Sequence, residues 1–301
     1  MLIPRFATVA RALSPEIRQA AVAARMSGFD GLQLDAITRQ LDVTTLSTTG
    51  YRELRHVFSS NAQTLFALRC EAGPEGLGPK SDTDRILDRA DGVLRASAAL
   101  GCTGVCFDLG RLPPAPRAAK LKPKVTPQMA GLLILPESKP AEPAADEPPA
   151  TKIDPAVLGY WQQALAALAD IADRYGQLVS IGTSLSSLAS LVAIVTSVNC
   201  PWFGIDFDTS AVVRDEWSAD EFFDAAAPLL QQVRARDAVA GEDRRSRPAV
   251  IGRGDVKWRE LLAGLDAAGY AGPITIDPTE LAEPTVATVA GLKQLKAVLS
   301  S

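Results

Sequence analysis

Histidine is almost absent from this 301-residue sequence, which contains only His56. The chain therefore cannot build the multi-histidine metal clusters on which metal-dependent nucleases rely. His56 falls in a stretch with a helical pattern, and we expect it to pack on or face out from that helix. The net charge of -4 also gives no reason to expect a nucleic-acid partner.

Cysteine pairs and long apolar runs are missing as well. The four cysteines (Cys70, Cys102, Cys106 and Cys200) form no CxxC pair, so we expect reduced thiols. No run approaches the roughly 20 apolar residues of a membrane span. The first residues, MLIPRFATVARAL, lack the charged, apolar and cleavage regions of a signal peptide. These absences predict a cytoplasmic protein with no membrane partner.

Short β-rich runs alternate with longer amphipathic runs, as in βα units around a parallel sheet. The predicted strands are residues 2–9, 31–36, 63–70, 103–110, 178–184, 201–208, 231–237 and 272–277. The predicted helices are residues 15–27, 49–60, 81–100, 155–175, 187–198, 218–230, 256–270 and 284–299. This alternation predicts a (β/α)8 TIM barrel. A doubly wound sheet is the alternative, but the glycine-rich phosphate turn that often follows its first strand is absent.

Three local signals support the helix boundaries. Ser14 is expected to cap the first helix with Pro15 at its first position, and Gly28 is expected to end it. Ser218, with Glu221 three residues later, has the pattern of a capping box.

Proline is concentrated in one segment of the chain. Eleven of the 21 prolines lie from Pro113 to Pro155 inclusive. Such a segment cannot bury enough apolar surface to offset the entropy lost on ordering. We interpret residues 113–154 as a disordered insertion after the fourth strand, within one barrel domain that covers residues 1–301.

Polar residues gather at the carboxyl ends of the predicted strands, where the active sites of such barrels are built. The two-residue period of a strand selects the inward candidates. They are Gln33, Asp35, Arg69, Glu71, Asp108, Ser180, Gly182, Ser184, Asp206, Asp208, Arg234, Arg236, Thr275 and Asp277, with Asp237 just beyond. Unpaired buried charges are costly, so this pattern predicts a polar barrel mouth. Any one aspartate could instead cap a helix or pair with an arginine of the seventh strand.

Four stretches carry a resemblance to a known family. They are AARMSGFDGLQLDA, ASAALGCTGVCFDLG, the run from ALADIADRYGQLVSIG to PWFGIDFDTSA, and IGRGDVKWRELLAGLDAAGYAGPITID. The sequence resembles the sugar phosphate isomerase/epimerase group of xylose isomerase-like barrels, which are related to the endonuclease IV fold. The resemblance implies a barrel that acts on a small carbohydrate next to a divalent metal ion.

The metal ligands that the resemblance implies are mostly replaced in this sequence. Asp208 keeps the aspartate of strand six, and Asp277 is a shorter stand-in for the glutamate of strand eight. The other ligand positions fall on Gln33, Gly182, Ala211 and Arg234. We therefore expect no resident metal or other cofactor, and Asp208 and Asp277 could hold Mg²⁺ or Mn²⁺ only weakly.

Two functions remain open from the sequence. In the first, the barrel is an isomerase or epimerase in which Asp208 and Asp277 act as acid and base while Arg234 stabilises a developing oxygen anion. In the second, it is a non-catalytic barrel that binds a small anion or polyol, or a scaffold. The remaining residues expected to contact the ligand are Asp35, Asp108, Asp206, Arg236, Asp237 and Arg253. Arg253 lies in a Gly-Arg-Gly turn that could hold a sugar phosphate or simply form a tight turn.

Overall fold

The computed structural model describes residues 4–73, 75–111, 155–184, 187–241 and 246–300, so the expected insertion at 113–154 lies outside the described residues. The strands are β1 (Arg5–Val9), β2 (Gly31–Asp35), β3 (Thr64–Cys70), β4 (Gly104–Arg111), β5 (Leu178–Ser184), β6 (Phe203–Asp208), β7 (Leu230–Ala235), β8 (Asp237–Ala240), β9 (Ser246–Ala249) and β10 (Pro273–Ile276). The α-helices are α1 (Ala10–Leu13), α2 (Ile17–Ser27), α3 (Thr48–Ser60), α4 (Thr83–Leu100), α5 (Pro155–Tyr175), α6 (Leu188–Ser197), α7 (Ala211–Arg214), α8 (Ala219–Ala226), α9 (Trp258–Ala267) and α10 (Pro284–Leu299).

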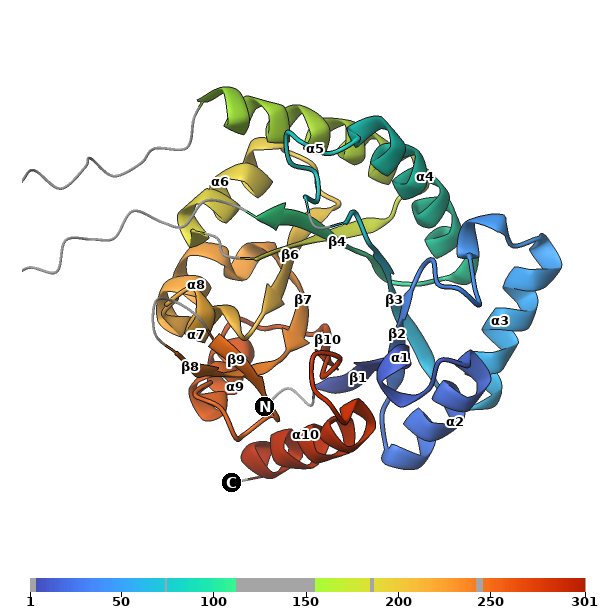
Figure 1. Cartoon of the computed structure of the whole chain (residues 1–301), viewed down its shortest axis with the longest axis vertical. Helices are drawn as coiled ribbons and strands as arrows, with labels where there is room; N and C mark the ends of the chain where they lie inside the picture. The colour runs from blue at the N-terminus through green and yellow to red at the C-terminus, as the bar shows by residue number, and fades with distance from the viewer. Residues whose placement is uncertain (1–3, 74, 112–154, 185–186, 242–245, 301) are drawn as a thin grey trace, which may run out of the picture.

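Eight parallel strands close into a barrel in the order β1-β10-β7-β6-β5-β4-β3-β2. The helices form a ring around it (Figure 1). The barrel closes where β1 pairs with β10, with Phe6 opposite Ile274 and Thr8 opposite Ile276. The predicted (β/α)8 barrel is therefore confirmed.

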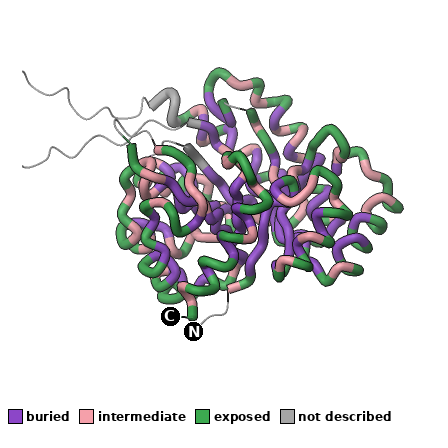
Figure 2. Tube along the Cα trace, turned by 60° about the horizontal axis from the view of Figure 1, so that its bottom comes forward, coloured by how far each residue is buried: buried purple, intermediate pink, exposed green. Residues whose placement is uncertain are grey.

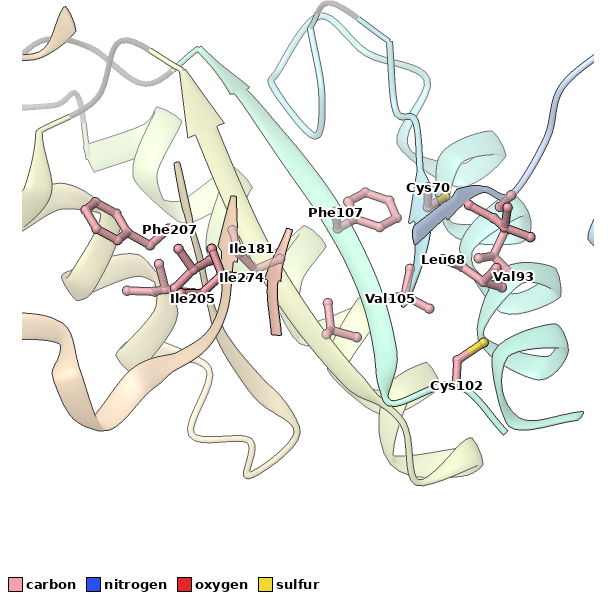
Figure 3. Packing of buried hydrophobic residues seen from close by; sticks show 14 of the residues in the cluster. Leu68, Cys70, Val93, Cys102, Val105, Phe107, Ile181, Ile205, Phe207 and Ile274 are labelled. Atoms are coloured by element: carbon pink, nitrogen blue, oxygen red, sulfur yellow. The ribbon is translucent and has the colours of Figure 1, made fainter. Parts of the chain in front are cut away.

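The hydrophobic core lies between the barrel and the helix ring, where buried residues run along the strands and the inner sides of the helices (Figure 2). On β6, Ile205 and Phe207 point outward, and the Phe207 ring stacks on Phe222 of α8 with centroids 3.8 Å apart. On the other side of the barrel, Leu68 of β3 and Val105 of β4 lie near Val93 of α4 (Figure 3). Full burial of each such side chain contributes about 1.5–3 kcal/mol.

The inner face of the barrel is polar toward the carboxyl ends of its strands, because the alternate residues of the same strands face inward. Gln33, Ser180, Asp206, Arg234 and Thr275 are all buried, and none belongs to the hydrophobic core. The outward apolar residues therefore fix the strands against the helices, while the inward residues supply hydrogen-bonding groups. The prediction of a polar mouth fits this arrangement.

The local boundaries match the predictions in two places and differ in one. Gly28 ends α2 with φ 82°, a left-handed conformation that favours glycine, and the Ser218 hydroxyl accepts a hydrogen bond from Glu221 N at the start of α8. The Ser14 cap is wrong. Ser14 is extended and follows the short helix α1, and its hydroxyl accepts from Glu16 N, so α2 begins only at Ile17.

The strand predicted at 231–237 divides in the structure. β7 ends at Ala235, and Asp237 begins β8, which pairs antiparallel with β9 as a separate two-stranded sheet. Among the helices within the described ranges, none combines the length and apolar character needed to span a bilayer.

Candidate functional site

A buried ion pair lies inside the barrel between β6 and β7. Arg234 Nη2 donates to Asp206 Oδ2 in a close contact, and the two residues are 7% and 4% exposed. In the sheet, Arg234 lies opposite Asp208 on one side and Thr275 on the other. Polar residues of the two neighbouring strands therefore lie on either side of this arginine.

Asp277 follows β10 and lies beside a second, partly buried arginine. Its Oδ2 is 3.3 Å from Arg69 Nη1 of β3, and its Oδ1 accepts a hydrogen bond of 2.6 Å from Thr279 Oγ1. Arg69 therefore reaches across the barrel mouth from β3 to the carboxylate that follows β10.

Asp208 ends β6 and lies between two further arginines. Its Oδ2 is 3.3 Å from Arg214 Nη1 of α7 and 3.7 Å from Arg236 Nη1, just after β7. Its Oδ1 accepts from Ser210 Oγ at 2.8 Å and from Ser210 N at 3.0 Å. Arg236 also pairs with Glu280 at the rim, at 2.8 Å. The short helix α7 thus brings Arg214 back to the strand that precedes it.

These arginines determine the ionisation of the two aspartates. Burial alone raises the pKa of Asp208, but Arg236, Arg214 and Arg234 outweigh it and hold that pKa well below its ordinary value. At Asp277, burial is again opposed, by Arg234, by the hydrogen bond from Thr279 and by Arg69, and the pKa is lowered. Both carboxylates are therefore anionic at neutral pH.

The β1–β2 side of the mouth differs. Asp35 at the end of β2 pairs with Arg11 of α1 at 2.8 Å, and Arg11 also lies 3.5 Å from Glu71. Burial raises the pKa of Asp35 more than Arg11 and Arg69 lower it, and the Glu71 carboxylate adds to the rise. Arg11 and Asp35 also border a pocket of about 900 Å³ between the α1–α2 segment and α3, with an apolar floor that includes Leu34 and Leu54.

Three of the predicted ligand-contacting residues take no part in the ion pairs described above. Asp237 turns toward the β8–β9 hairpin, where its carboxylate accepts hydrogen bonds from the backbone of Ala238, Gly252, Gly254 and Val256 and from Trp258 Nε1. Asp108 on β4 lies opposite Gly182, and its Oδ1 accepts from Gly110 N at 2.8 Å. Arg253 is exposed on the loop between β9 and α9.

The structure therefore brings together five of the nine predicted site residues, Asp206, Asp208, Arg234, Arg236 and Asp277, in one cluster. It places Asp35 on the opposite side of the mouth. Sequence reasoning missed Arg11 and Arg214. Each had a positional signal, since Arg11 follows β1 by two residues and Arg214 follows β6 by six. His56, as expected, is exposed on α3.

The donor set at the mouth does not fit a divalent metal ion. No group of three or more His, Cys, Asp or Glu side chains within the described residues is arranged to hold one. A Cβ built at Gly182 would lie 3.6 Å from Asp206 Oδ2 and 3.8 Å from Arg234 Nη2, so this position, where the resemblance implied a ligand, lies against an existing ion pair. Arg234 can only donate hydrogen bonds, and its buried Nε has no partner in the described structure.

Two further buried polar atoms, Gln33 Oε1 and Thr275 Oγ1, also lack a partner among the described atoms. Both residues lie on the inner face, and Gln33 Nε2 donates to Cys106 Sγ at 3.0 Å. The interior beneath the mouth therefore retains hydrogen-bonding capacity that the protein itself does not satisfy.

Comparisons with known proteins identify the family. A family model described as xylose isomerase-like TIM barrel matches residues 20–298. No curated protein matches the sequence. Among solved structures, the chain is similar to a xylose isomerase domain protein from Planctomyces limnophilus, with 16% identity, a TM-score of 0.72 and coverage of 99% of this chain and 96% of that one.

Two other similar structures carry more specific names. The 3-keto-D-glucoside 4-epimerase of E. coli is 18% identical, with a TM-score of 0.65 and coverage of 97% and 98%. A xylose isomerase-like TIM barrel protein from Mycobacterium smegmatis, in complex with magnesium, is 15% identical, with a TM-score of 0.67 and coverage of 99% and 97%. At these identities the likeness establishes the fold alone.

Proposed function

We propose, on the premise that this chain belongs to the xylose isomerase-like TIM barrel family, that its mouth binds a small carbohydrate through paired carboxylates and arginines. The observation that carries the proposal is the cluster in which Asp206, Asp208 and Asp277 surround Arg234, with Arg69 and Arg236 beside them. The names of similar barrels include a sugar epimerase, which agrees with this ligand class.

Carbohydrate hydroxyls suit such a cluster because each hydroxyl both donates and accepts hydrogen bonds. A carboxylate accepts from one hydroxyl while the neighbouring guanidinium donates to the next one. Bonds to charged groups are also stronger than those between neutral groups. A neutral polyol therefore finds both kinds of partner at Asp208 with Arg236 and at Asp277 with Arg69.

The cluster is also held in place before any ligand arrives. Ser210 and Thr279 fix the carboxylates of Asp208 and Asp277 by hydrogen bonds from both their backbone N–H and their hydroxyl groups. The buried Asp206–Arg234 pair holds the arginine. Side chains that are already ordered lose less entropy on binding, so this site is suited to a small ligand that makes few contacts.

A second candidate is isomerisation or epimerisation of the same carbohydrate. Asp208 ends β6 and Asp277 follows β10, the two strands that flank the strand of Arg234. A carbon held between the two carboxylates could lose a proton to one and gain it from the other while Arg234 stabilises the oxygen. A general base works best when its pKa lies near the working pH, and the lowered pKa of both groups makes them weak bases. The geometry therefore supports binding better than turnover.

The test combines a stability measurement with product analysis. Ketohexoses such as D-fructose, at millimolar concentration, are expected to raise the Tm of the wild-type protein because they bind only the folded state. The rise in Tm should be lost in Asp208→Asn. It should be kept in the control Asp91→Asn, which removes one negative charge from α4, where Asp91 pairs with Arg174.

The two measurements decide between no binding, binding alone and turnover. If no sugar of the panel raises the Tm, or if Asp208→Asn responds as the wild type does, the binding proposal is wrong. If NMR detects an isomer or epimer that forms with wild type and not with Asp208→Asn, the second candidate replaces it.

A further inference from the structure

Arg234 is the common neighbour of the buried acidic groups in this barrel. It projects from β7, which lies between β6 and β10 in the closed sheet. Asp206 contacts it directly, Asp208 is its register partner on β6, and Asp277 follows β10, where its N–H bonds to Ala235 O, the residue after Arg234. Carboxylates from both neighbouring strands thus surround one cation.

The electrostatic environment of this guanidinium reflects that arrangement. Burial alone lowers the pKa of Arg234, but attraction to Asp206, Asp277 and Asp208 reverses the effect and raises the pKa above its ordinary value. An arginine stays charged at every pH at which proteins fold. The positive charge among these carboxylates is therefore permanent.

Gly182 lies beside the Asp206–Arg234 ion pair and adds no side chain to it. Gly182 of β5 has no side chain to reach the pair, although the position of its Cβ is within 4 Å of both Asp206 Oδ2 and Arg234 Nη2. A fourth ligand, which a tightly bound divalent ion would need there, is thus missing where a cation is already held. The missing ligand at Gly182 and the guanidinium held beside it both indicate that an arginine charge has replaced a metal charge.

We propose that Arg234 is the resident cation of this barrel, that its guanidinium takes the place among Asp206, Asp208 and Asp277 that a divalent ion would otherwise occupy, and that it excludes such an ion. Two positive charges a few ångströms apart in a buried site repel strongly. A divalent ion can therefore enter only when the arginine charge is removed. With the arginine charge removed, the negative charge of the three carboxylates is expected to attract a divalent ion.

The test is to remove the charge and measure metal binding. Arg234→Gln keeps an amide that can donate to Asp206 but leaves three carboxylates without the central cation. We expect this variant to bind Mn²⁺ about tenfold or more tightly than the wild type, as measured by the electron paramagnetic resonance signal of free Mn²⁺. Arg234→Lys, which retains the charge, is the matched control and should bind Mn²⁺ no better than the wild type.

A second variant locates the ion. Adding Asp208→Asn to Arg234→Gln should abolish the gain, because the ion then loses one of its three carboxylates. The proposal is overturned if folded Arg234→Gln, judged by circular dichroism, binds Mn²⁺ no better than the wild type. It is also overturned if Arg234→Lys gains as much, or if the wild type itself binds stoichiometric Mn²⁺ that Asp208→Asn removes.

If loss of the buried ion pair prevents Arg234→Gln from folding, a further double variant provides the test. Asp206→Asn combined with Arg234→Gln removes both charges of the pair and leaves Asp208 and Asp277. Millimolar Mn²⁺ should raise the Tm of this double variant and leave that of the wild type unchanged, and the absence of any difference would overturn the proposal. None of these measurements uses a sugar, so they succeed or fail independently of the proposed carbohydrate binding.

Discussion

The two sides of the barrel mouth use the same residue types and reach opposite electrostatic results. On the β6–β7–β10 side the pKa values of Asp208 and Asp277 are lowered, whereas on the β1–β2 side the pKa of Asp35 is raised. Burial does not account for the difference, because the side chains of Asp208 and Asp35 are similarly exposed, at 11% and 10%.

The number and burial of the arginines account for it. Asp208 has Arg214 at 3.3 Å and Arg236 at 3.7 Å, and both arginine side chains are less than a fifth exposed. Asp35 contacts Arg11, which is 37% exposed and also serves Glu71. A shared and more solvated arginine offsets less of the cost of burying a carboxylate than two largely covered arginines do. The ionised state of each carboxylate thus depends on its partners.

The largest expected effect comes from breaking the buried pair on the β6–β7 side. Asp206→Ala leaves the Arg234 charge buried without its contacting partner, which is expected to lower the free energy of unfolding by about 3–5 kcal/mol. Urea denaturation measures the change. The matched variant Asp35→Ala, on the other side, should cost much less, and equal losses would break the comparison.

The next prediction sharpens the comparison through pH. A lowered folded-state pKa adds stability that is present above the ordinary aspartate pKa of about 3.9 and is lost as the pH falls through the folded value. Asp277→Asn should therefore lower the free energy of unfolding at pH 7 by about 1–2 kcal/mol, and the difference from wild type should shrink in acid.

Asp35→Asn should behave in the opposite way. A raised folded-state pKa means that the ionised form is disfavoured by folding, so the cost is present at neutral pH and is relieved as the pH falls through the folded value. The variant should be as stable as the wild type at pH 7, or slightly more stable, and should lose that advantage in acid. Urea titrations across acidic and neutral pH give both profiles, and parallel profiles for the two variants would contradict the assigned pKa directions.

The smallest expected effect concerns Arg11. Arg11→Gln removes an exposed partner of Asp35, and pairs of this kind contribute about 0–1 kcal/mol. Because exposed charges are screened, the difference from wild type should shrink further in about 1 M salt, where the Debye length is about 3 Å. Urea denaturation at low and high salt measures it, and a loss of several kcal/mol would mean that Arg11 is far more important than its exposure indicates.

The barrel and its polar mouth could be predicted because both depend on short periods in the sequence. Alternation along β6 places Ile205 and Phe207 outward and Asp206 and Asp208 inward, and the structure has this arrangement. The β8–β9 hairpin could not be predicted, because its strands have four residues each, and β9 contains Pro248 and exposed Arg247. Neither strand shows a two-residue alternation of burial.

The pairing of charges was the part that the sequence left open. Sequence reasoning allowed an aspartate to pair with Arg234, but it could not choose among Asp206, Asp208 and Asp277, since the choice depends on strand register. The structure places Asp206 in contact. At the end of β7, neighbouring residues point in different directions. Arg236 faces the mouth, whereas the carboxylate of Asp237 accepts from five N–H donors of β8, of the loop after β9 and of α9.

The closure of the barrel between β1 and β10 sets an order in which the mouth can be assembled. The Asp206–Arg234 pair joins residues 28 apart in the chain, whereas the Arg69–Asp277 pair joins residues 208 apart. Contacts between distant residues form late, because a long loop must first be closed. A chain emerging from the ribosome can therefore form the central ion pair early, whereas the Arg69–Asp277 pair must wait until β10 has been synthesised and has closed the barrel against β1.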